Sequence, residues 1–209
     1  MMREALLWAS ENPFLARKLP TYPFVKRATK RFLPGETLDD ALTEADRLKR
    51  SDITTTLTLL GEHLASEAEA DGVVDHYVGA LGRIAARGLD TEISVKLTQL
   101  GLDFGSEGAE SRLRSLLDST TSLVWVDMEG SEYVDATLDI FRSLRGSHQN
   151  VGLCLQSYLH RTPEDIQTLL PLDPAIRLVK GAYKEPASVA HERKQDVDRS
   201  FVKLTATLL

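Results

Sequence analysis

Four polar side chains stand at the ends of, or inside, four different apolar runs of the sequence: Lys96, Asp127, Gln156 and Arg177. Arg177 lies within its run, where an unpaired charge is expensive, so we expect it to have a partner. Lys180 follows three residues later and adds a cation. If these places meet in the fold, cations dominate them, and the chemistry to expect is the recognition of an anionic ligand.

The segments that would position these side chains alternate between two kinds. Short apolar or β-branched runs, predicted as strands, cover Ile53–Leu60, Ile93–Leu97, Leu123–Val126, Val151–Leu155 and Ile176–Val179. Helical spacing marks the stretches Ser66–Arg87, Gly108–Ser119, Glu132–Leu144, Pro163–Leu169 and Lys194–Leu209. Five βα units in a row predict a parallel sheet with covering helices, in which sites lie at the carboxyl ends of the strands.

Two architectures fit this alternation, an open doubly wound sheet and a (β/α)8 barrel. Eight units of this size would need roughly 300 residues, within the range of such barrels. A barrel would therefore be incomplete in this sequence, with about five of its eight units. The spacing by itself does not choose between the two.

The first fifty residues differ from the rest. Helical spacing marks Met2–Leu19 and Pro23–Phe32, and Thr37-Leu-Asp-Asp40 has the form of a capping box that opens a helix to about Arg50. We therefore predict an N-terminal helical segment at 1–50 and the partial barrel at 51–209. Between residues 12 and 35, six basic residues and no acidic one accompany four aromatic residues. This segment could bind a membrane surface, or pack on the barrel with its cations reaching water.

Composition and motifs exclude several classes of protein. With 25 basic and 31 acidic residues, the net charge of −6 argues against a nucleic-acid partner. The single cysteine, Cys154, rules out an internal disulfide framework and is expected in the core. The five histidines lack metal-ligand spacing, and neither GxGxxG nor a P-loop occurs. Without a membrane-spanning run or a signal-peptide core, the expected location is the cytoplasm.

Five stretches, in order along the chain, resemble the FAD-dependent proline dehydrogenase family: Leu59-Leu-Gly-Glu-His63, Ser94-Val-Lys-Leu-Thr98, Val126-Asp-Met-Glu129, Leu155-Gln-Ser-Tyr-Leu159 and Arg177-Leu-Val-Lys-Gly-Ala-Tyr183. The last is the most specific, and the similarity runs from about Leu33 to the final residue. The resemblance implies a flavin-binding (β/α)8 barrel that oxidises L-proline to Δ1-pyrroline-5-carboxylate, with a membrane quinone as electron acceptor.

The resemblance also implies roles for individual residues. Lys96 would sit beside the proline carboxylate, Asp127 would be the active-site acid, and Arg177 would hydrogen-bond near flavin N5. Contacts to FAD would come from Met128, Gln156 and the backbone of Lys180, Gly181 and Ala182. A preorganised cation near the flavin would stabilise the negative charge that hydride transfer places there.

The sequence departs from the family at its end. Family members continue through three more strands and a paired-arginine motif that clamps the proline carboxylate, and this sequence has no Arg-Arg pair. We therefore expect an N-terminal piece of a proline dehydrogenase that does not turn over proline alone. Two other interpretations stay open: a Schiff-base lyase or aldolase using Lys96 or Lys180, and a non-catalytic barrel remnant.

Overall fold

A computed structural model describes residue 22, residue 35, residues 37–61 and residues 64–209. Contacts divide the chain into two compact units, residues 1–53 and 54–209. The predicted helices at 2–19 and 23–32, and the basic segment at 12–35, fall almost wholly outside the described residues. The predicted domain boundary after residue 50 stays a prediction.

In the first unit, helix α4 covers Leu38–Lys49. The predicted capping box opens it: Thr37 Oγ1 accepts a hydrogen bond from the Asp40 backbone at 3.2 Å, and Asp40 Oδ2 accepts one from the Thr37 backbone at 3.2 Å. This reciprocal arrangement satisfies two of the backbone N–H groups that a helix start leaves without partners.

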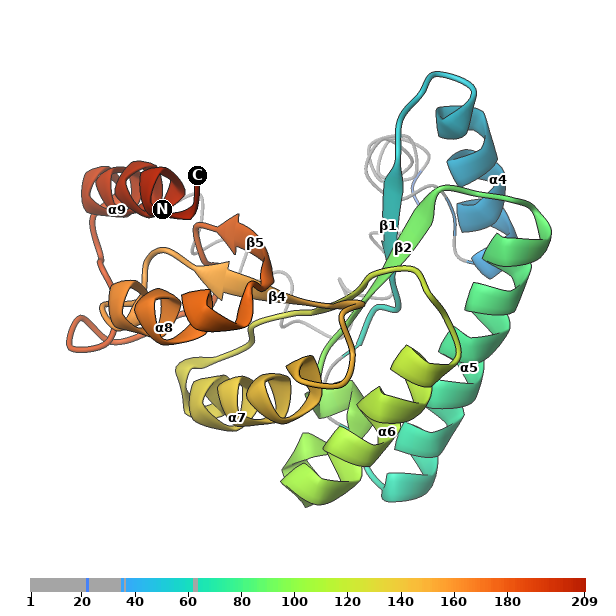
Figure 1. Cartoon of the computed structure of the whole chain (residues 1–209), viewed down its shortest axis with the longest axis horizontal. Helices are drawn as coiled ribbons and strands as arrows, with labels where there is room; N and C mark the ends of the chain where they lie inside the picture. The colour runs from blue at the N-terminus through green and yellow to red at the C-terminus, as the bar shows by residue number, and fades with distance from the viewer. Residues whose placement is uncertain (1–21, 23–34, 36, 62–63) are drawn as a thin grey trace. The chain divides into compact units, whose positions relative to one another are not determined.

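The second unit alternates strands and helices (Figure 1). In chain order these are β1 Thr55–Thr58, α5 Glu67–Ala86, β2 Thr91–Val95, α6 Ser106–Asp118, β3 Val124–Val126, α7 Val134–Arg145, β4 Val151–Gln156, α8 Thr162–Leu169, β5 Ala175–Val179 and α9 Lys194–Leu208. Short 3-10 helices cover Thr98–Leu100 (η2), Leu102–Phe104 (η3), Ser131–Tyr133 (η4) and Leu170–Leu172 (η5). All five predicted strands and their helices are present; the 3-10 helices were not predicted.

The strands form one sheet in the order β1-β2-β3-β4-β5, and every neighbouring pair is parallel. A doubly wound sheet reverses its strand order at a switch point, whereas a barrel keeps the chain order. The sequential order therefore favours the barrel, of which the described residues form five βα units. Among the described residues, no helix is long and apolar enough to cross a membrane.

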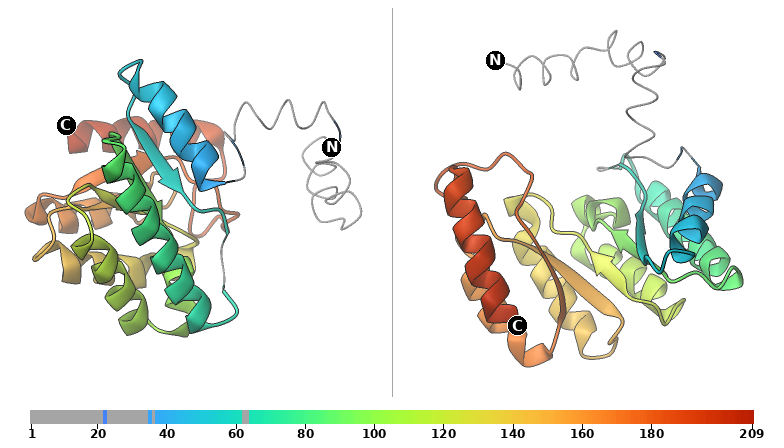
Figure 2. Two further views of the ribbon diagram at one scale, coloured as in Figure 1. Left: turned by 90° about the vertical axis from the view of Figure 1, so that its right-hand side faces the viewer. Right: turned by 90° about the horizontal axis from the view of Figure 1, so that it is seen from above.

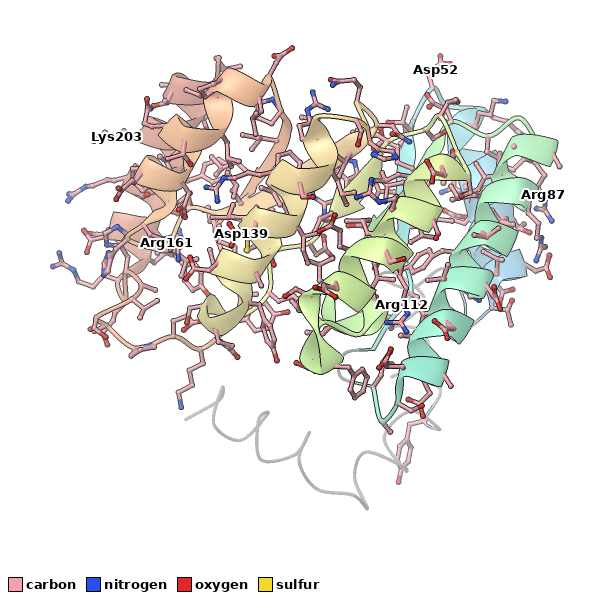
Figure 3. The ribbon with its side chains drawn as sticks, turned by 60° about the horizontal axis from the view of Figure 1, so that its bottom comes forward. Asp52, Arg87, Arg112, Asp139, Arg161 and Lys203 are labelled. Atoms are coloured by element: carbon pink, nitrogen blue, oxygen red, sulfur yellow. The ribbon has the colours of Figure 1, made fainter. Side chains whose placement is uncertain are left out.

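The two faces of the sheet have different characters. On the face that the helices cover, the apolar residues of the inner strands β2, β3 and β4 are at most 2% exposed: Ile93, Val95, Val124, Val126, Val151, Leu153 and Leu155. Figure 3 shows helices α5, α6 and α7 side by side over this face, with Arg112 of α6 lying against α5. Arg112 pairs there with Glu67 and Asp71. Figure 2 shows the sheet from two further sides. The alternate residues of each strand point to the opposite face, which carries the polar side chains.

Candidate functional site

The Asp127 carboxylate is the centre of a cluster of charged side chains on the face of the sheet opposite to helices α5, α6 and α7. Its Oδ2 accepts a hydrogen bond from Lys96 Nζ at 3.1 Å, and its Oδ1 accepts one from Ser94 Oγ at 2.6 Å. Arg177 Nη2 donates to the same Oδ1 and, at 2.9 Å, to Ser94 Oγ. Two cations thus share one anion, which leaves one surplus positive charge. We call Ser94, Lys96, Asp127 and Arg177 the charged cluster.

The register of the sheet explains why these residues meet. Lys96 and Asp127 each follow a paired residue, Val95 and Val126, at the carboxyl ends of β2 and β3. Arg177 lies opposite Cys154 on the neighbouring strand β4. Because the Cys154 side chain is small, the long Arg177 side chain can extend past β4 on the same face of the sheet and reach Asp127, which follows β3. The side chains of Lys96, Asp127 and Arg177 are 20%, 18% and 32% exposed, so the cluster is partly desolvated but can be reached by a ligand.

Trp125 lies next to the charged cluster on the same face of β3. The Arg177 guanidinium carbon is 5.2 Å from the centroid of the Trp125 ring, within the range of a cation–π contact. Indole Nε1 donates to Glu92 Oε2 at 2.6 Å. The ring also covers Gly152, where a Cβ would come within 2.7 Å of it.

Two weakly acidic groups border the charged cluster. Burial raises the pKa of the Cys154 thiol, and the neighbouring Arg177 opposes this by favouring the thiolate. Burial also raises the pKa of Tyr77, whose hydroxyl donates to the Ser94 carbonyl at 3.0 Å and accepts from the Leu59 backbone at 2.9 Å. Tyr77 therefore ties the end of β1 to the backbone of the cluster.

Gln156 and Met128 lie together beside the charged cluster. Gln156 is 3% exposed, and its Nε2 donates to the Met128 carbonyl at 2.9 Å. Its buried Oε1 has no hydrogen-bond partner among the described residues. A buried amide oxygen in this state is costly, which indicates that a donor from elsewhere belongs there.

The segment after β5 departs from a regular strand at Gly181. Its φ is +111°, and a Cβ there would lie 2.2 Å from Tyr158 Cδ1, so glycine is the residue that fits. Burial, together with the nearby Glu185, raises the pKa of Tyr158 to about 12. The backbone at Lys180 accepts a hydrogen bond from Tyr158 N at 2.9 Å.

Lys180 does not join the charged cluster. Its Nζ donates to Asp198 of α9 at 2.5 Å, and its side chain is 51% exposed. The expectation that this lysine adds to the cations of the site is wrong for its side chain, because its position is one residue out of phase with the inward Val179. Only its backbone remains near the site.

Sequence reasoning missed Ser94 and Trp125 as members of the site. Ser94 stood in a quoted stretch and Trp125 in the predicted strand Leu123–Val126. Each lies two residues before a predicted site residue and on the same face of its strand, which is the signal that could have found them. It also missed Glu129, which is 2% exposed and accepts hydrogen bonds from the backbone and hydroxyl of Thr98.

Comparison with known proteins identifies the kind of site. The sequence profile of a family described as proline dehydrogenase matches residues 41–209. Proline dehydrogenase 1 of Bacillus subtilis subsp. natto is 38% identical over 207 residues, which cover 98% of this chain and 68% of the relative. Proline dehydrogenase of Deinococcus radiodurans is 34% identical over 215 residues, with the same two shares.

A solved structure with a similar fold carries a related name. The crystal structure of proline utilization A from Bdellovibrio bacteriovorus, inactivated by N-propargylglycine, matches with a TM-score of 0.76 and 23% identity. The match covers 85% of this chain and 24% of that one. At this identity it shows the likeness of the fold.

Proposed function

Because the chain belongs to the proline dehydrogenase family, we propose that its charged cluster binds L-proline and a flavin, FAD, for oxidation of proline to Δ1-pyrroline-5-carboxylate. The observation that carries this proposal is the convergence of Lys96, Asp127 and Arg177 from three strands. Their surplus positive charge suits a carboxylate substrate and a cofactor that gains negative charge.

The residues present fit a flavin. Gln156 Oε1, for which the described part of the chain supplies no partner, is an acceptor suited to a ring N–H, and Met128 lies beside it. The backbone of Lys180, Gly181 and Ala182 would complete the contact, since Gly181 allows a close approach. When bound, the flavin supplies the acceptor for the hydride that leaves proline C5, while the amine proton is lost and the C=N bond forms.

The roles of the side chains follow from their charges and contacts. Lys96 offers a point charge to the substrate carboxylate. Asp127 holds both cations in place through its two ion pairs. Arg177 provides a preorganised donor for the developing negative charge, and the loss of such a donor costs on the order of 10²–10³ in rate.

The geometry offers less to the Schiff-base alternative. A lysine nucleophile needs its neutral amine, which desolvation or a neighbouring cation favours. Lys96 instead contacts a carboxylate, and Lys180 pairs with Asp198 at the exposed side of α9. Both lysine side chains are thus engaged in ion pairs with carboxylates.

The test is the response of bound flavin to L-proline. We expect purified protein to bind FAD saturably and L-proline to change its absorbance spectrum. Lys96→Met and Asp127→Asn should remove the proline response, whereas Asp139→Asn, on the exposed surface of α7, should leave it intact. Lack of saturable flavin binding, or a proline response that survives both site substitutions, would contradict the proposal. The spectral test does not measure repeated oxidation of proline. That the 209 residues alone do not turn over proline stays a prediction.

We also propose an electron acceptor and a location for the protein. A membrane quinone follows from the family resemblance, and the basic segment at residues 12–35 would bring a cytoplasmic protein to a membrane surface. Reversal of the charges at Lys26, Arg27, Lys30 and Arg31 should abolish liposome binding. Unchanged binding would remove the membrane interpretation.

A further inference from the structure

We infer that Trp125 is a positioning residue for Arg177, because its indole face holds the guanidinium in the charged cluster. The consequence for catalysis rests on the proposed function, whereas the contact itself does not. No role for Trp125 follows from the residues that carry the family resemblance.

The hydrogen bonds of Arg177 to Asp127 and Ser94 come from one end of its guanidinium. The donor to both Asp127 and Ser94 is the same nitrogen, Nη2. Both of these bonds therefore hold the guanidinium at one end. The side chain is also 32% exposed, so burial does not restrain it fully. The ring of Trp125, 5.2 Å from the guanidinium carbon, adds a contact to the body of the guanidinium.

Trp125 is itself held from two sides. Its Nε1 donates to Glu92 Oε2 at 2.6 Å, which fixes the edge of the indole. Beneath it, Gly152 leaves the space that the ring fills, since a Cβ would lie 2.7 Å from Trp125 Cε3. Glycine inside a strand is unfavourable unless another group approaches closely, and the indole is that group. Glu92, Gly152 and Trp125 therefore form a support under Arg177.

The first test needs no cofactor. A double-mutant cycle of Trp125→Leu and Arg177→Met, read from urea unfolding, measures the coupling of the two side chains. We expect a coupling that corresponds to about a 5- to 30-fold change in the unfolding constant, the size of a partly desolvated cation–π contact. Additive effects would overturn the inference. Should Trp125→Leu not fold, the same cycle with Trp125→Phe gives a smaller coupling of the same sign, and zero there is equally contradictory.

The second test follows the positioning into the flavin site. In the FAD-loaded protein we expect Trp125→Leu to move the flavin midpoint potential to more negative values, in the same direction as Arg177→Met. Trp125→Phe, which keeps an aromatic face, should retain most of the wild-type potential. Gly152→Ala, which forces the indole to move without altering either partner, should act like Trp125→Leu. Asp139→Asn, on the exposed surface of α7, serves as the control and should leave the potential unchanged.

A purely structural role of Trp125 would lower the midpoint of thermal unfolding and leave the flavin potential unchanged, and that result would overturn the inference. Failure of the proposed function looks different. Wild-type protein would then bind no FAD, while the double-mutant cycle would still report the coupling between Trp125 and Arg177.

Discussion

Replacement of Asp127 by asparagine should destabilise the folded protein, because it leaves Lys96 and Arg177 without their shared anion. The local charge rises from one surplus positive charge to two. At 3.1 Å, the attraction between Lys96 and Asp127 is about 5 kcal/mol at an effective dielectric constant of 20. Partial exposure lets water replace part of it, and hydrogen bonds to charged groups contribute about 1.5–3 kcal/mol net. For the two ion pairs together we expect a loss of about 2–4 kcal/mol.

The assay is urea unfolding at pH 7, with Asp139→Asn as control. Asp139 forms a pair with Arg142 on α7 and is 77% exposed, so its loss should change the free energy of unfolding by less than about 0.5 kcal/mol. Adding Lys96→Met to Asp127→Asn removes one of the two unpaired cations and should recover about 1–2 kcal/mol. A loss below about 0.5 kcal/mol for Asp127→Asn, or no recovery in the double variant, would refute the reasoning about a shared anion.

Three further outcomes are expected. Gly181→Ala combines a φ of +111° with a Cβ 2.2 Å from Tyr158, so it should cost about 2 kcal/mol or more in urea unfolding and weaken FAD binding; wild-type values for both would contradict the account. Arg145 is 6% exposed and donates to four backbone carbonyls, so Arg145→Leu should lose about 2–4 kcal/mol, and a loss no larger than that of Arg145→Lys would be contrary. The hydrogen bond to Asp103 raises the pKa of Tyr133 to about 12. Since a raised pKa favours the protonated folded state, the contribution of Tyr133 to the free energy of unfolding is complete below roughly pH 10 and is lost as the pH rises toward 12. Asp103→Asn should therefore flatten the decline of the free energy of unfolding over this pH range. An unchanged slope of that free energy against pH would contradict the assignment.

The fold could be read from the sequence because its signals are local. Apolar runs alternate with helical spacing, and the capping box at Thr37 is complete within four residues. The strand order was not predictable from spacing, since a doubly wound sheet has the same alternation of elements. The pairing of distant strands decides that order, and the register of each pair decides which polar residues meet.

The site was predictable where its residues follow from local signals, and not where they depend on the pairing of strands. Lys96 and Asp127 were expected at strand ends and Arg177 inside a strand with a partner, and the structure joins the three. Lys180 faces the other side because a single residue changes the face of a strand. Trp125 escaped notice because an aromatic residue in an apolar run resembles core. Its contact with Arg177 depends on Gly152, the residue opposite it on the next strand, which leaves room for the indole ring.

The central claim, that the charged cluster and the backbone after β5 hold a flavin, is tested most directly by titration of the purified, desalted protein with FAD while its visible absorbance is recorded. The account predicts saturable binding with a perturbed flavin spectrum, weakened by Gln156→Leu and by Arg177→Met and unaffected by Asp139→Asn. If the FAD titration shows no saturable change in the spectrum, and the protein is colourless again once free FAD is removed by desalting, the claim is contradicted.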